Sequence, residues 1–147
     1  EALLRIDERK NMNINITDIV DNFKVFDDWE DRYRYLIDLG NHLPPMEEAL
    51  KTEKNRVRGC MSQVWMVMSW DQGGRLSLQA DSDAMIVRGL VAVLYSIFNG
   101  KTSAEMKEID VEEIFRTLDL DQHLSPNRRN GFYAMVERIR AFTAGCT

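Results

Sequence analysis

Cys60 is the side chain in this sequence that is best suited to covalent chemistry. It follows Gly59, whose missing Cβ lets the backbone adopt torsions that strain other residues, so the thiol can sit on a tight turn. Positive charge near a cysteine favours the thiolate, which is the nucleophilic form. Glu53 alone opposes the cations that precede the cysteine, which are Lys51, Lys54, Arg56 and Arg58. The pattern is that of a reactive thiol, although an inert buried cysteine before an apolar strand is the commoner case on these features alone.

Other groups that could take part in covalent or metal chemistry are few. The second cysteine, Cys146, stands in the terminal segment Thr143–Thr147, where we expect an exposed, incidental thiol. The histidines, His42 and His123, lack ligand-like spacing and there is no CxxC motif, so no metal site is predicted. We expect His123 to be structural, without a charged partner nearby.

Composition narrows the class of protein. The 147 residues fit one domain, and 44% hydrophobic with 29% charged residues is typical of a soluble globular chain. A formal net charge of −5 argues against nucleic-acid binding, which needs an excess of lysine and arginine. No run approaches the roughly 20 apolar residues that span a bilayer, so no membrane association is expected. Residues 1–11 are too charged for a secretory signal, which favours a cytoplasmic protein.

Periodicity separates helical segments from one hairpin. Segment 63–70 is rich in apolar residues, and segment 75–80 alternates between apolar and polar residues. The two flank turn residues at 71–74, so they predict a β-hairpin. Helical spacing predicts helices over residues 16–26, 46–50 and 83–99. Capping and stop residues predict four more: one from Asp28 to Gly40, one after each of the capping boxes at Thr102 and Asp110, and one that begins at Ser125-Pro126. Helices, one small antiparallel sheet and further helices make the fold class α+β.

Four groups of short motifs then carry a family resemblance. They are Trp29–Tyr33 with Leu39–Gly40 and Leu43–Pro44, then Gly59–Trp65, then Ala80–Ala84 with Ile86–Leu90, and last Leu124–Gly131. Each motif alone is weak, but the four follow one another in register over about residues 15–142. Together they make the chain resemble the SufE family.

The resemblance implies one SufE/IscU-like domain over residues 15–143, in which a small antiparallel sheet packs against several helices. Residues 1–14 would be a flexible segment, or one that is not native to the protein, and residues 144–147 would be a flexible tail. The implied function is to take persulfide sulfur from a cysteine desulfurase onto Cys60, to stimulate that enzyme, and to pass the sulfur on for iron–sulfur cluster assembly. Such a protein is an accessory carrier rather than an independent enzyme and has no cofactor. Its partners would be a SufS-like, pyridoxal-phosphate desulfurase and a downstream cluster scaffold.

Two other functions stay open beside this one. An iron–sulfur scaffold of the IscU type has a similar α+β shape, but a cluster needs several thiolate or imidazole ligands, which Cys60 and Cys146 do not supply. A cysteine hydrolase needs an oriented general base, and neither histidine has such a setting.

The resemblance also implies a set of residues that support the cysteine. In the family the cysteine tip rests on an apolar surface and swings out on docking; Met61, Val64 and Trp65 are the candidates here. The residues implied for loop support or partner binding are Arg58, Gly59, Ser62, Gln63, Asp81, Asp83 and Arg128.

Some of these residues have purely structural explanations. Asp81, Ser82 and Asp83 precede a predicted helix, where they could cap its free N–H groups; the resemblance adds that this segment packs beside the cysteine loop and restrains it. Arg128 and Arg129 lie in the first turn of the last helix, where a cation is unfavourable by about 0.3–1 kcal/mol. They could pair with Asp119 or Asp121, whereas the resemblance favours Arg128 as a docking residue near the loop.

Overall fold

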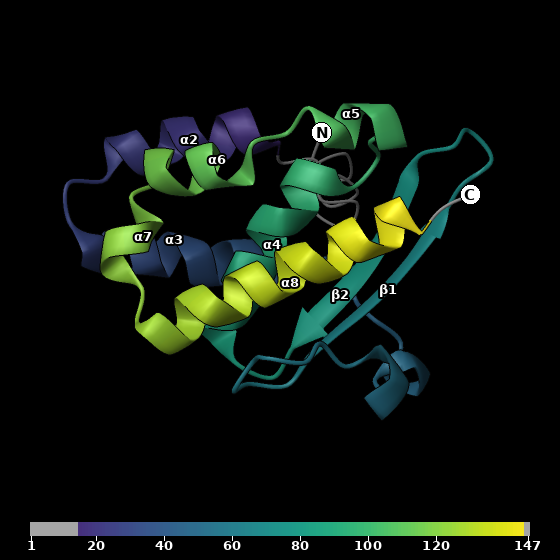
Figure 1. Ribbon diagram of the computed structural model, residues 1–147. Helices are drawn as coiled ribbons and strands as arrows, with labels where there is room; N and C mark the ends of the chain where they lie inside the picture. Colours follow the sequence, from purple (N-terminus) through teal and green to yellow (C-terminus); the bar gives the residue numbers. More distant parts are fainter. Residues whose placement is uncertain (1–14, 146–147) are drawn as a thin grey trace, which may run out of the picture.

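The structure, a computed structural model, describes residues 15–145 of the chain; the segments 1–14 and 146–147, with Cys146, lie outside the described residues. Within that range helices precede and follow a single hairpin, which confirms the α+β class (Figure 1). The α-helices are α2 (Ile16–Val25), α3 (Trp29–Asn41), α4 (Met85–Phe98), α5 (Ser103–Lys107), α6 (Val111–Thr117), α7 (Leu120–His123) and α8 (Pro126–Ala144). The 3-10 helices are η1 (Glu48–Leu50) and η2 (Glu53–Asn55), and the strands are β1 (Val64–Trp70) and β2 (Leu76–Ser82).

The hairpin pairs β1 with β2 in antiparallel register, from Val64 opposite Ser82 to Trp70 opposite Leu76. Its turn is closed by the Asp71 carboxylate, which accepts hydrogen bonds from the backbone N–H groups of Gly73 and Arg75, each at 2.9 Å. The alternation in the second strand has the predicted effect, since Leu76, Leu78 and Ala80 are all buried. Helices α4 and α8 pack on this side of the sheet, and α8 runs obliquely across it (Figure 1).

Helix α4 is the centre of the core, and its backbone touches that of α3. A Cβ on Gly89 would lie 2.3 Å from the Leu36 carbonyl oxygen, and a Cβ on Gly40 would lie 2.8 Å from the Gly89 nitrogen. The prediction that Gly40 stops α3 is wrong, because the helix continues to Asn41 and is capped at His42. Gly40 is instead buried at a helix crossing too close for any side chain.

Helix α8 begins as its sequence predicts and carries one wall of the candidate site. The Ser125 hydroxyl accepts a hydrogen bond from the Arg128 backbone N–H at 3.3 Å, and Pro126 occupies the first turn. Its buried stripe consists of Gly131, Phe132, Met135, Val136 and Ile139. No helix within residues 15–145 is long and apolar enough to cross a membrane.

Candidate functional site

Cys60 lies at the end of a segment that runs along α8 toward the start of that helix. Near the middle of α8, the Arg138 side chain donates a hydrogen bond to the backbone of this segment. Closer to the start of the helix, Gly59 lies so near Ala134 that a Cβ added to the glycine would stand 3.2 Å from the Ala134 Cβ. The Cys60 Sγ then donates a hydrogen bond to the Gly131 carbonyl oxygen at 3.5 Å. Gly59 has φ +91°, so both its conformation and its closeness to α8 favour glycine. We call the segment 57–62 the cysteine loop.

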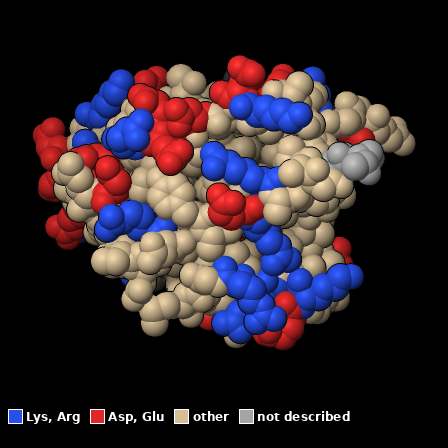
Figure 2. Space-filling view, viewed as in Figure 1, with Lys and Arg blue, Asp and Glu red and all other residues tan. Residues whose placement is uncertain are grey.

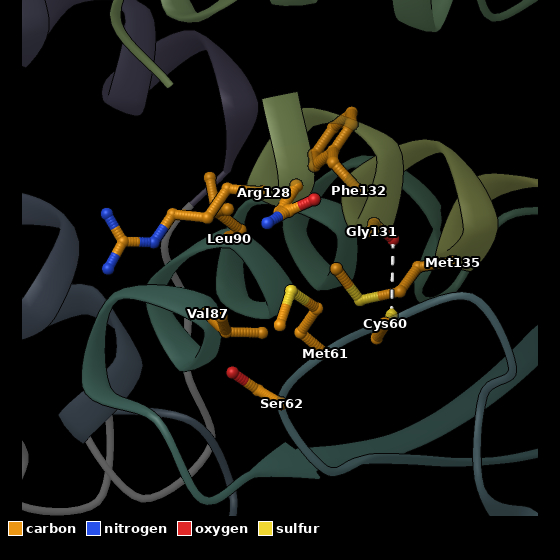
Figure 3. A pocket seen from close by; sticks show the side chains of 10 residues that line it. Cys60, Met61, Ser62, Val87, Leu90, Arg128, Gly131, Phe132 and Met135 are labelled. Atoms are coloured by element: carbon orange, nitrogen blue, oxygen red, sulfur yellow. Dashed lines mark hydrogen bonds between the residues drawn. The ribbon is translucent and has the colours of Figure 1, made fainter. Parts of the chain in front are cut away.

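A small cavity opens beside the Cys60 thiol, between the cysteine loop, α4 and α8 (Figure 3). Its volume is about 40 Å³, which is room for roughly three water molecules at 10–15 Å³ each. The apolar walls are the buried side chains of Val87, Leu90, Phe132 and Met135. Of the apolar side chains expected from sequence, Met61 lines the cavity while being 79% exposed as a residue, but Val64 and Trp65 do not line it.

Burial raises the pKa of the Cys60 thiol above its ordinary value, and the Arg56 guanidinium lowers it by less. The expectation that nearby cations make this thiol ionise readily is therefore wrong while the loop is docked. Sequence spacing could not reveal that α8 partly covers the half-buried Cys60. The docked loop favours the neutral thiol of Cys60, which donates a hydrogen bond to the Gly131 carbonyl oxygen.

The cations around the loop are also partly neutralised. Lys51 points away to Asp81, with its Nζ 3.0 Å from the carboxylate. Arg56 and Arg58 share Glu53, at 3.3 and 3.7 Å. Lys and Arg side chains still gather at the lower edge of the face in Figure 2, in the region that Figure 1 assigns to the chain before β1. Arg58 remains mostly exposed there and does not line the cavity.

The raised pKa has a testable consequence for thiol alkylation. In a Cys146→Ser background, we expect the rate of Cys60 alkylation by iodoacetamide to rise with a midpoint at higher pH than in the same chain unfolded in urea. Because the folded state holds the proton more tightly, the stability gained from the thiol is present below its unfolded-state pKa and lost as pH rises through the folded-state pKa. A folded midpoint at or below the unfolded one would contradict the docked geometry.

Asp83 fixes the far end of the cysteine loop. Its carboxylate accepts a hydrogen bond from the Gln63 backbone N–H at 3.1 Å, and its own N–H donates to the Gln63 carbonyl at 3.2 Å. Neither Asp81 nor Asp83 caps the following helix, because the N-cap of α4 is Ala84, which makes no side-chain capping bond. The capping explanation is thus wrong for both aspartates. Ser82 Oγ does accept a bond from the Ala84 N–H at 3.2 Å.

Asp81 braces the residues on either side of the loop. Its half-buried carboxylate binds Arg88 of α4 at 2.9 Å and Lys51 at 3.0 Å, so it joins the start of the α4 helix to the segment before the cysteine. Arg88 also donates to the Ser82 carbonyl at 3.0 Å. Asp81 therefore lies behind the loop rather than in the cavity.

The two arginines at the start of α8 differ. Arg128 lines the cavity together with Ser62 and Asn127, and its guanidinium extends away from Cys60 (Figure 3). Arg129 is half-buried, with its Nε buried and without a hydrogen-bond partner. Within the described part of the chain neither arginine forms a salt bridge, so the alternative in which they pair with Asp119 or Asp121 is wrong.

Several residues of the site were not singled out from sequence. Val87, Leu90 and Gly131 lie inside the family motifs, and Phe132 and Met135 lie at helical spacing in the segment predicted to be the last helix. The sequence does not show that these five residues converge. They meet at one cavity only because α4 and α8 pack together.

Histidines and possible metal ligands lie apart from this cavity. His123 stacks on Trp29 with ring centroids 4.1 Å apart, and its Nε2 is 3.9 Å from Asp119. The expectation that His123 has no charged partner is therefore wrong. Among residues 15–145, no three His, Cys, Asp or Glu side chains gather in a way that could hold a metal ion.

Comparison with known proteins gives a consistent answer. The family model of SufE, described as "Fe-S metabolism associated domain", matches residues 17–143. An uncharacterized SufE-like protein of Rhizobium meliloti (strain 1021) is 44% identical over 134 residues, which cover 89% of this chain and 96% of that protein. Another from Rhizobium etli is 46% identical over 129 residues, covering 86% and 87%.

A solved structure shares the fold. The solution structure of a hypothetical protein from Thermus thermophilus superposes with a TM-score of 0.70 at 21% identity, over 88% of this chain and 93% of that one. The family match and the two relatives each extend over most of the chain, and they confirm the family resemblance found in the sequence. The chain therefore belongs to the SufE family.

Proposed function

We propose that the protein is a sulfur acceptor that takes sulfane sulfur from a cysteine desulfurase onto Cys60, stimulates that enzyme, and hands the sulfur on to a scaffold for iron–sulfur cluster assembly in the cytoplasm. The family's link with Fe–S metabolism supports the general role. The observation that carries the finer proposal is the setting of Cys60, a thiol on a short loop beside an apolar cavity.

The transfer is a thiol–disulfide exchange. The Cys60 thiolate attacks the outer sulfur of the desulfurase persulfide, the bond between the two persulfide sulfurs breaks, and the desulfurase cysteine leaves as a thiolate. A Cys60–S bond forms in its place, so Cys60 carries the persulfide and the enzyme cysteine is restored. No net oxidation or reduction occurs, and the proton stays with the outer sulfur or is lost to water.

The docked loop is suited to storage rather than to attack. Burial raises the pKa of the thiol, so the nucleophilic thiolate is scarce until Cys60 leaves the cavity. Swinging the loop outward would expose the sulfur to water and remove the burial that opposes the effect of the Arg56 guanidinium. A partner that favours the open loop thus activates the acceptor, and closing the loop shelters the product.

Intact-mass analysis tests this proposal. The Cys146→Ser variant, incubated with a pyridoxal-phosphate cysteine desulfurase and cysteine, should gain the mass of one sulfur atom, and peptide mapping should locate it on Cys60. Desulfurase turnover should rise on addition of the protein. A variant that gains no sulfur under these conditions, or gains it at a residue other than Cys60, would overturn the proposal.

Charge reversal at Arg128 tests the docking role proposed for this arginine. Arg128→Glu should weaken desulfurase stimulation about ten-fold, because an exposed cation at the edge of the cavity would become an anion facing the partner. Arg140→Glu makes the same charge change on the same helix outside the cavity and serves as the matched control. Equal stimulation by the two variants, with unchanged thermal unfolding, would count against the docking role.

A further inference from the structure

Arg138 joins α8 to residues 51–57, which we call the stem because the chain passes through them into the tip of the cysteine loop. Its guanidinium donates two hydrogen bonds to backbone carbonyls of that stem, from Nη1 to the Arg56 oxygen at 2.8 Å and from Nη2 to the Lys54 oxygen at 3.2 Å. Arg138 stands about two helical turns after Gly131, whose carbonyl accepts the thiol bond. One side chain thus holds the stem alongside the helix on which Cys60 rests.

Little else of a polar kind attaches this part of the chain to α8. Within residues 15–145, the hydrogen bonds between segment 51–62 and α8 are the two from Arg138 and the thiol bond of Cys60. A thiol is a weak donor, and its distance to the Gly131 oxygen is long at 3.5 Å. Hydrogen bonds from a charged donor are roughly twice as strong as neutral ones. Arg138 therefore supplies most of this attachment.

The stem has a separate attachment to the sheet. The Val57 N–H donates to the Val64 carbonyl at 2.8 Å, Arg56 bridges to Trp65, and Val57 is buried. These contacts do not involve Arg138. Removing the guanidinium should leave the stem on β1 but free it from α8, so the change would reach Cys60 without unfolding the core.

We propose that Arg138 is a latch: a positioning residue that sets how readily the cysteine loop leaves α8 and presents Cys60 to a sulfur donor. The use of that opening rests on the proposed function, whereas the opening itself can be measured without any partner. While the latch is closed, Cys60 stays beside Gly131 and the cavity. Breaking the two carbonyl bonds leaves the thiol bond and the apolar packing around the cavity to hold the tip against α8.

Alkylation of Cys60 by iodoacetamide tests the latch in a Cys146→Ser background. Arg138→Ala should raise the alkylation rate at pH 7 about ten-fold, the factor expected for loss of hydrogen bonds from a charged donor. The pH midpoint of the profile should also fall, because the thiol spends more time in water. Arg138→Gln keeps one neutral donor group and should lie between the parent and Arg138→Ala. Arg140→Ala, on the same helix and paired with Glu137, should behave as the parent.

The thermal unfolding midpoint separates a latch from a general loss of packing. Opening the latch should change the alkylation rate and its pH profile at nearly unchanged thermal stability, whereas loss of packing would also lower the thermal midpoint. A rate and pH midpoint in Arg138→Ala equal to those of Arg140→Ala would overturn the latch. If Arg138→Ala does not fold, parent-like values in Arg138→Gln would overturn it equally. Faster alkylation of Arg138→Ala without any sulfur loading from a desulfurase would uphold the latch and count against the proposed function. Sulfur loading together with an unchanged alkylation rate would uphold the proposed function and count against the latch.

Discussion

Replacing Cys60 by serine is expected to abolish sulfur uptake and the stimulation of a desulfurase. A serine hydroxyl is not ionised at neutral pH and forms no stable bond to sulfane sulfur, so the exchange has no acceptor. The substitution should leave the fold intact, because the hydroxyl can donate to the same Gly131 carbonyl that accepts the thiol bond. Intact mass and desulfurase turnover measure the two losses, and the unfolding midpoint in urea checks the fold.

Cys146→Ser is the matched control for this loss, since it removes the other thiol of the sequence. It should take up one sulfur as the parent does. Sulfur found on the Cys60→Ser protein, or full desulfurase stimulation by it, would move the acceptor role to another group and contradict the mechanism.

Gly89→Ala is expected to destabilise the fold by about 2 kcal/mol or more, despite the higher helix propensity of alanine. The new methyl carbon would lie 2.3 Å from the Leu36 carbonyl oxygen and 2.7 Å from its carbon, so two helix backbones would have to separate. Because the colliding atoms are backbone and cannot move aside, the overpacking cost should reach the upper end of its range, roughly 3 kcal/mol or more, and the alanine returns about 1 kcal/mol of propensity. Urea unfolding followed by circular dichroism gives the change in free energy.

Gly131→Ala provides the comparison for that prediction. It makes the same change inside a helix, but its new methyl would stand 3.4 Å from the Cys60 Sγ, which is an ordinary contact. We expect its unfolding free energy to stay within about 1 kcal/mol of the parent. Equal stabilities for the two alanine variants would show that α3 and α4 do not touch as described.

Local signals explain how much of the fold could be predicted from sequence. The hairpin follows from alternation and from the turn at Asp71, and the start of α8 follows from Ser125 and Pro126, because each depends on neighbours in the chain. The prediction that Gly40 ends its helix is wrong, although a glycine near the end of a helix commonly stops it. Only the packing of α3 against Gly89 reveals that close contact is the reason for glycine here.

In the candidate site too, sequence motifs identify some residues, whereas the contacts of these residues depend on distant parts of the chain. Cys60 and Arg128 could be named from the motifs, yet the raised pKa of the thiol depends on α8, which lies some seventy residues further along the chain. Asp83 looked like a helix cap because it precedes α4, and its actual partner is the backbone of Gln63 across the hairpin. Arg138 carries no motif at all, because its acceptors are backbone carbonyls that any residue provides.

The size of the cavity beside Cys60 also limits what the protein can carry with its loop closed. Room of about 40 Å³ accommodates a group of one to three heavy atoms, such as the outer sulfur of a persulfide. A mixed disulfide with a peptide thiol is far larger, so it would hold the loop off α8 and leave the sulfur–sulfur bond open to the next thiol. If the protein carries sulfur as proposed, short cargo would be enclosed and bulky adducts would stay exposed, so the volume of the pocket would distinguish one sulfur species from another.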